Sequence, residues 1–206
     1  QLSLSNMNNY IYPNYFGNVS AMSLANLAGM VVILVLSTFI VKLSAKVGKK
    51  ELSVIGSIIS AAAFLILFFI HTDNVWVWIV LVLISSVGTA MFNMVIWAMI
   101  TDVIDESEVQ TGVRQDGTIY SVYSFARKLG QACSSGLSGV LLSIIGYTSV
   151  TAFDPKVVDG IYNITCLVPA GGMILLLLAL WFLYPLNKKR VEENAEKLRI
   201  KRNENA

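Results

Sequence analysis

The chain has 206 residues, of which 55% are apolar and 14% are charged, and its formal net charge at pH 7 is +2. An ordinary soluble domain carries about 25% charged residues, so this composition excludes a single water-soluble core and is typical of a membrane protein. The small net charge gives no indication of nucleic-acid binding, and we expect no nucleic-acid partner.

Apolar blocks of about 20 residues, the length that a membrane-spanning helix needs, recur five times along the chain. We therefore predict an all-α integral membrane fold. Residues 1–22 are interpreted as an outer loop or the end of a preceding helix. Residues 187–206 are interpreted as a charged tail that is either a solvated helix or disordered. The predicted spans within the membrane region 23–186 are 23–43, 53–70, 75–100, 118–146 and 160–184.

Basic residues are concentrated in the turn after the first span and in the C-terminal tail. Segments 1–22 and 71–74 contain no Lys or Arg, and the loop 147–159 contains only Lys156. Lys and Arg accumulate on the cytoplasmic side of membrane proteins. We therefore expect a cell (plasma or inner) membrane protein with its N-terminus outside and its C-terminus in the cytoplasm. The basic residues of the turn and tail are Lys42, Lys46, Lys49, Lys50, Lys188, Lys189, Arg190, Lys197, Arg199, Lys201 and Arg202.

The predicted span 75–100 carries Asn93 and Trp97, which are one helical turn apart. A buried amide must find a hydrogen-bond partner, which for Asn93 is either a substrate hydroxyl or a neighbouring helix. For Trp97, an interfacial or packing role and stacking against a sugar are both compatible with the sequence.

The polar segment 101–117 combines five carboxylates with a single cation, Arg114. One interpretation is a solvated acidic loop. The other is a cytoplasmic gate built from Asp102, Asp105, Glu108 and Arg114, in which Arg114 forms charge-assisted contacts with the acids. The five carboxylates are Asp102, Asp105, Glu106, Glu108 and Asp116.

A polar stripe at intervals of three and four residues marks the predicted span 118–146, and it comprises Ser121, Ser124, Lys128, Gln131, Ser135 and Ser138. Such a stripe faces a cavity or other helices, and the serines could equally hold helices together. Gly136 and Gly139 predict close helix packing on this span.

Lys128 lies 11 residues past Gly117, or about 16 Å along a helix, close to the middle of a hydrocarbon core about 30 Å thick. A lysine there costs at least about 2.5–3.5 kcal/mol, so it needs a partner or a watery cavity. We expect Lys128 to serve a transport site, with a structural ion pair as the alternative. Arg127 is expected to share the cavity or to pair with an acid on another helix.

Chemistry of other kinds is not indicated. Cys133 and Cys166 fall inside predicted spans and are expected to be buried small hydrophobes rather than a disulfide. The sequence contains neither a Cys/His cluster nor a visible nucleophile–base pair. We therefore expect no metal site, no cofactor and no enzymatic activity.

The motif Thr101-Asp-x-x-Asp-x-x-Glu-x-x-Thr-Gly-x-Arg-x-x-Gly117, followed by Ser124-Phe-x-x-Lys128-x-Gly, resembles the signature of the glycoside–pentoside–hexuronide:cation symporters. These are the melibiose-permease-like members of the major facilitator superfamily. The resemblance extends over essentially the whole chain. The five predicted spans correspond to helices eight to twelve of the family, so the chain resembles the C-terminal half of a transporter without its N-terminal half.

The resemblance implies symport of a sugar with Na⁺ or H⁺ by alternating access, with the ligands of the coupling ion mainly in the N-terminal half. By resemblance, Lys128 matches a lysine implicated in cation coupling and sugar binding, and Asn93 falls on a helix that lines the sugar cavity. Asp102 and Arg114 match positions associated with conformational switching. The candidate substrate and coupling residues are Lys128, Asn93, Trp97, Ser124, Gln131 and Arg127. The expected partners are a sugar, the lipid bilayer and the missing N-terminal half.

Two other functions are compatible with the sequence. One is a transporter of the same superfamily that carries a non-sugar substrate, such as a lysolipid or another organic anion. The other is a membrane assembly subunit that needs a partner protein to complete it. The run from Ser124 to Gln131 is most similar to the glucuronide or pentoside branches of the symporter family.

Overall fold

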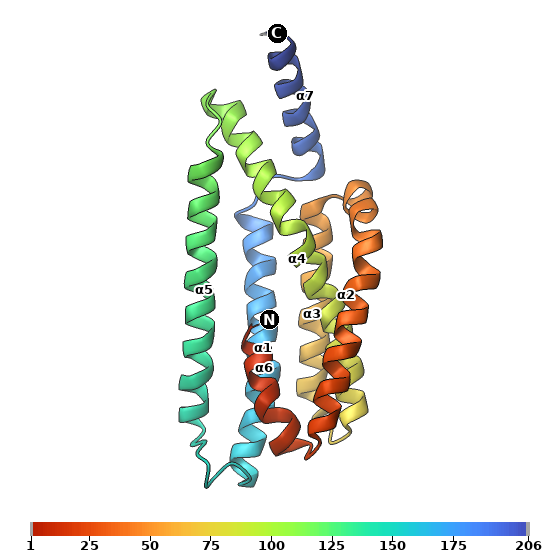
Figure 1. Cartoon of the computed structure of the whole chain (residues 1–206), viewed down its shortest axis with the longest axis vertical. Helices are drawn as coiled ribbons and strands as arrows, with labels where there is room; N and C mark the ends of the chain where they lie inside the picture. The colour runs from red at the N-terminus through yellow and green to blue at the C-terminus, as the bar shows by residue number, and fades with distance from the viewer. Residues whose placement is uncertain (1, 205–206) are drawn as a thin grey trace.

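The computed structural model describes residues 2–204, and every regular element within that range is a helix. Figure 1 shows long helices that run roughly along the vertical axis of the molecule, with α5 set apart from α2 and α3. The elements are α1 (Leu2–Tyr10), the π-helix η1 (Ile11–Tyr15), α2 (Val19–Val47), α3 (Lys49–Ile70), α4 (Val75–Thr111), α5 (Asp116–Ile144), α6 (Pro155–Phe182) and α7 (Lys188–Glu204). The predicted all-α fold is confirmed.

Four of these helices, α2, α3, α4 and α6, are long and apolar enough to cross a membrane. The fifth predicted span, 118–146, forms the 29-residue helix α5 but does not reach the same apolar character. The reason is its sequence, in which Arg127, Lys128 and several serines interrupt the apolar residues.

The interpretation of segment 101–117 as a loop is wrong for most of its length. Helix α4 continues through the acidic residues to Thr111 and ends at Gly112, whose φ of 77° lies in the left-handed region. The backbone N–H of Gly112 donates to the carbonyl of Glu108 at 2.9 Å, as in a glycine-terminated helix. Only residues 112–115 connect α4 to α5.

The segments outside the predicted spans are also more helical than expected. Residues 2–15 form α1 and η1, so the end of a preceding helix describes them better than an outer loop does. Helix α6 begins at Pro155, where a proline suits the first helical turn because its missing N–H needs no partner. In the tail, residues 188–204 form α7, so the solvated-helix interpretation is confirmed there.

The tightest helix contact joins α3 and α4 at Gly56 and Gly88. A Cβ added to either glycine would collide with the backbone carbonyl of the other, so only glycine allows this approach. Beside it, the hydroxyl of Ser60 lies 2.7 Å from that of Ser85 and 3.2 Å from that of Thr89. We call this contact the α3–α4 seam.

Gly136 and Gly139 on α5, which would allow close helix packing, meet no neighbouring helix among the described residues. A Cβ at either position would meet nothing within 4 Å. Cys133, on the same helix, is exposed rather than buried, whereas Cys166 of α6 is buried as expected. Both cysteines are free, as predicted.

Charged segments and buried aromatic residues lie at opposite ends of the molecule (Figure 1). At one end lie the basic turn after α2, the α4–α5 connection and α7. At the other end, the fully buried rings of Tyr12, Trp78 and Tyr162 join η1, α4 and α6. There the hydroxyl of Tyr162 donates to the carbonyl of Leu67 at 2.8 Å and accepts from the N–H of Thr72 at 3.1 Å. The two ends are called the charged end and the aromatic end.

Candidate functional site

A cavity of about 800 Å³ opens between α2, α4, α5 and α6. Most of its lining is apolar, and its polar side chains come chiefly from one face of α4. On the opposite wall, Gly171 and Gly172 of α6 leave the backbone uncovered, because a Cβ at either would meet nothing within 4 Å. The polar lining residues are Ser85, Ser86, Thr89 and Asn93 of α4 and Ser134 of α5.

Asn93 is the one residue of the predicted substrate set that lines this cavity. Its amide is exposed, and it interacts with another residue, as does Ser134 across the cavity. Thr89 lies one turn along α4 and donates its hydroxyl to the carbonyl of Ser85 at 3.0 Å. The sequence prediction missed Ser85, Ser86, Thr89 and Ser134. The spacing of Ser85, Thr89 and Asn93 at intervals of four on an apolar helix was a usable signal.

Trp97 and Arg127 contact each other across the α4–α5 interface. The guanidinium carbon of Arg127 lies 5.3 Å from the centroid of the Trp97 ring, within the range of a cation–π interaction. Tyr120 stacks on Trp97 with ring centroids 5.7 Å apart, and Tyr123 meets it edge-on at 5.4 Å. Among the described residues, Arg127 therefore contacts an aromatic ring and does not form the predicted pair with an acid. We call Trp97, Tyr120, Tyr123 and Arg127 the Trp97 cluster.

Lys128 and Gln131 are exposed on α5, and Ser124 is partly buried. Within residues 2–204, Lys128 makes no hydrogen bond or ion pair, so the structural ion pair considered from the sequence is not formed inside this chain. The predicted polar stripe reaches the interior only at Ser138, which is buried. The side of α5 that meets α4 carries Tyr123 and Arg127 instead.

Asp102 of the predicted gate forms an ion pair with Lys49 of α3, with 2.6 Å between Nζ and Oδ1. Asp102 is only 5% exposed, and its second oxygen, Oδ2, has no hydrogen-bond partner among the described residues. Lys49 was assigned to the basic turn as a topology signal, so this pairing was missed. The pair closes the α3–α4 seam at the charged end.

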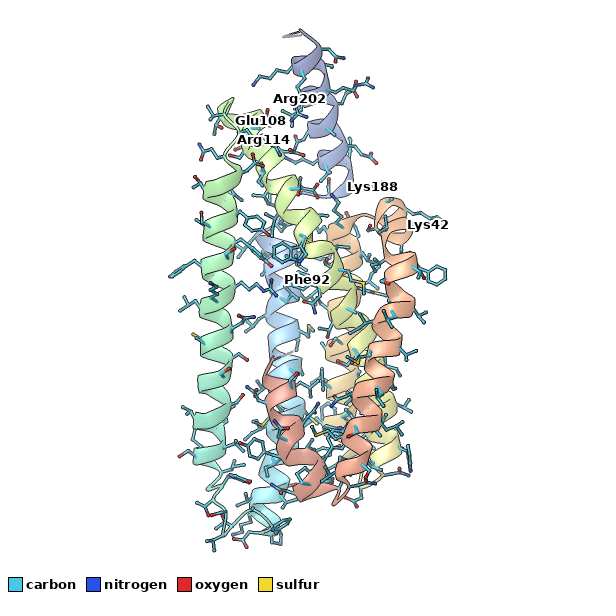
Figure 2. The ribbon with its side chains drawn as sticks, in the orientation of Figure 1. Lys42, Phe92, Glu108, Arg114, Lys188 and Arg202 are labelled. Atoms are coloured by element: carbon cyan, nitrogen blue, oxygen red, sulfur yellow. The ribbon has the colours of Figure 1, made fainter. Side chains whose placement is uncertain are left out.

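Arg114 contacts three carboxylates, which confirms the predicted contact between this cation and the acidic segment. Its guanidinium nitrogens lie 2.8 Å from Asp105, 2.9 Å from Glu108 and 2.8 Å from Asp116. These acids raise the pKa of Arg114 above its usual range, because each hydrogen bond favours the charged guanidinium. Figure 2 shows Glu108 and Arg114 close together near the α4–α5 connection.

Helix α7 joins the same network through residues that the sequence prediction did not select. Arg190 donates to Glu106, with 3.2 Å between Nε and Oε2, and Asn194 donates to the same carboxylate. Arg202 reaches Glu108 at 3.4 Å, and Figure 2 places these two residues at the same end of the molecule. No sequence signal indicated that the tail would fold back onto the acidic part of α4.

Comparison with known proteins identifies a family and several related proteins. The family described as MFS/sugar transport protein matches residues 2–188. The glucuronide carrier protein homolog of Escherichia coli (strain K12) is 35% identical over 149 residues, which cover 72% of this chain and 32% of that protein. An uncharacterized symporter of Bacillus subtilis (strain 168), YjmB, is 38% identical over 152 residues, which cover 74% of this chain and 33% of that protein. The matched part is thus about a third of the length of these relatives.

Proposed function

The chain belongs to the MFS/sugar transport protein family, and we propose that it is the C-terminal part of a secondary active transporter that carries a glycoside, pentoside or hexuronide together with a cation. The relatives are carriers and symporters, and the helices are those of a membrane protein. The observation that carries the proposal is the cavity between α2, α4, α5 and α6, which has hydroxyl and amide groups on apolar membrane helices.

The volume and lining of the cavity support a sugar site. Its volume of about 800 Å³ lies within the usual range for small-molecule sites, about 300–1,000 Å³. Thr89 and Asn93 offer hydroxyl and amide groups that can exchange hydrogen bonds with sugar hydroxyls. The apolar remainder of the lining suits the C–H faces of a sugar ring. A cavity between membrane helices, with a few polar groups in its lining, is consistent with a substrate site near the bilayer midplane.

For orientation, we propose that the charged end faces the cytoplasm and the aromatic end faces outward. The support is the distribution of cations, because the basic turn and α7 share the charged end, and the start of α6, whose first turn contains Lys156, lies at the other end. In this orientation the C-terminus is cytoplasmic. The ion pairs of Arg114 and Arg190 then lie at the inner mouth, where exchange between alternative partners would accompany opening and closing.

For coupling, we propose that Lys128 faces an acidic group from the part of the transporter that precedes this chain. Lys128 lies near the middle of α5 and finds no partner among the described residues, and an unpaired buried cation is costly. Entry of Na⁺ or H⁺ at that acidic group would compete with the lysine. The coupling ion would bind mainly to residues outside this chain.

The test uses the full-length protein in proteoliposomes. Labelled glucuronide is expected to exchange across the membrane in counterflow, and an imposed Na⁺ or proton gradient should drive its accumulation. Asn93→Ala should raise the half-saturating sugar concentration about 10-fold, because one group that can hydrogen-bond to the sugar is lost. Ile33→Val, which removes one methylene from the α2 side of the same cavity, is the matched control. Absence of exchange for glucuronides, glycosides and pentoses alike would refute the proposal.

A further inference from the structure

Arg127 differs from the other arginines of this chain because it does not pair with a carboxylate among the described residues. All five arginines lie in the described range 2–204, and four of them pair with carboxylates. Those pairs are Arg114 with Asp105, Arg190 with Glu106, Arg199 with Glu196 and Arg202 with Glu108. Arg127 instead lies on an aromatic face. The acid that follows Trp97 most closely along α4, Asp102, is already held by Lys49.

The contact with Trp97 leaves the hydrogen-bonding capacity of Arg127 unused. A guanidinium carries five N–H donors in its plane, and a cation–π contact uses its charge rather than those donors. No described residue accepts a hydrogen bond from Arg127. Trp97 is 43% exposed and Tyr120 is 47% exposed, so part of the surface of each residue is open to a ligand. The cluster therefore presents a planar cation beside aromatic surface.

We infer that Arg127 and Trp97 form an anion subsite that selects sugars bearing a carboxylate or a sulfonate. The inference rests on the proposed sugar transport and specifies its substrate class. Arg127 moves from the Trp97 face to grip the anionic group with two parallel N–H donors. The uncovered aromatic face then stacks on the sugar ring, while the adjacent Lys128 adds positive potential.

The position of the subsite fits one ligand that spans it and the cavity. Trp97 follows Asn93 by one helical turn on α4, or about 6 Å along the helix axis. A sugar acid bound with its hydroxyls near Asn93 can therefore place its anionic group at Arg127. The exocyclic carboxylate of a uronic acid projects from the ring in a way that suits this separation.

A lipid phosphate is the other source of an anion, and the depth of Arg127 argues against it. Arg127 lies 11 residues from the start of α5 at Asp116, or about 16 Å along the helix. That distance is about half of the hydrocarbon thickness, where headgroups do not reach. The substrate is the anion that can reach this level through the cavity.

The experiment compares two sugars that differ only at C6, a labelled glucuronide with a carboxylate there and the corresponding glucoside with a hydroxymethyl group, in the full-length protein reconstituted in vesicles. Arg127→Ala should lower glucuronide uptake about 10- to 100-fold relative to glucoside uptake. Arg127→Lys should retain part of the preference, because lysine keeps the charge but not the paired donors. Trp97→Ala should weaken both sugars. Lys156→Ala, which removes a cation at the aromatic end, is the control and should change neither.

Three outcomes would overturn the inference. Equal losses for both sugars in Arg127→Ala would make Arg127 structural. Loss of the Arg127 effect when phosphatidylglycerol is omitted from phosphatidylcholine vesicles would assign the anion to lipid. If the wild type transports neither sugar, the proposed function fails, and calorimetric titration with glucuronate then tests the subsite alone. Binding that disappears in Arg127→Ala would support the subsite, and binding that is absent or unchanged would refute it.

Discussion

The α3–α4 seam and helix α5 are built in opposite ways. In the seam, Gly56 and Gly88 bring two backbones into contact. The buried serines there form hydrogen bonds with one another or with backbone carbonyls of their own helix. Helix α5 contacts α1 and α4, but most of its side chains are exposed and its glycines face open space. Near its middle it also carries two adjacent cations, Arg127 and Lys128.

The difference indicates that the two regions have separate roles in stability and in function. A seam of small residues has no room to rearrange, because packed interiors transmit strain rather than absorb it. A helix with exposed polar groups can instead gain contacts when the remainder of a transporter covers it. We therefore expect the seam to determine whether the chain folds, and α5 to determine what the transporter does.

The largest effect on stability is expected from Gly88→Leu. The new side chain would collide with the backbone of Gly56, so α3 and α4 must separate and the Ser60–Ser85 contact must open. We expect a loss of about 3 kcal/mol in the free energy of unfolding, measured by denaturation of the full-length protein in detergent. Gly136→Leu on α5, where an added Cβ would meet no atom of this chain within 4 Å, is the comparison variant and should cost less stability than Gly88→Leu. Similar losses in both variants would remove the distinction between the two regions.

A smaller effect is expected where the seam ends at the Lys49–Asp102 pair. Lys49→Ala leaves the carboxylate of Asp102 buried without its cation, while its Oδ2 already has no partner among the described residues. Because the Lys49 side chain is 30% exposed, we reduce the usual cost of breaking a buried pair to about 1–3 kcal/mol. Lys46→Ala, an exposed neighbour in the same turn, should be nearly neutral.

A double variant sharpens that test. Lys49→Ala combined with Asp102→Ala removes both charges and should recover part of the lost stability, because no uncompensated carboxylate remains. If adding Asp102→Ala to Lys49→Ala costs as much stability as Asp102→Ala costs alone, the two residues do not interact. The proposal that this pair closes the α3–α4 seam would then be wrong.

The helical membrane fold was predictable from composition and block length, because apolar runs of spanning length have few alternatives. The continuation of α4 to Thr111 was not predictable, because a run of acidic residues indicates a solvated loop when their partners are unknown. Those partners, Lys49 and Arg190, lie on α3 and α7. Charge pairing across 53 or more residues leaves no local pattern in the sequence.

The site was predictable only in part for a similar reason. Asn93 was found because a lone amide on an apolar helix needs an explanation. The stripe through Lys128 was correct as a periodicity, but periodicity does not say which face of α5 meets α4. The structure turns Tyr123 and Arg127 toward Trp97 and leaves Lys128 exposed, a rotation of about one residue, or 100°, around the helix.

A modest effect on stability, and a large one on function, is expected from Lys128→Ala. Lys128 has no hydrogen-bond or ionic partner among residues 2–204, so its truncation removes no contact within this chain. The free energy of unfolding should fall only through loss of the proposed acidic partner, by less than the loss expected for Gly88→Leu. Sugar accumulation driven by an Na⁺ or proton gradient should nevertheless be lost, because the competition between Lys128 and the coupling ion is removed. Uptake into energised proteoliposomes measures this, and counterflow without a gradient shows whether sugar exchange persists. Full accumulation by Lys128→Ala would contradict the coupling role, whereas a stability loss as large as that of Gly88→Leu would mean that α5 is as much a part of the folded core as the seam.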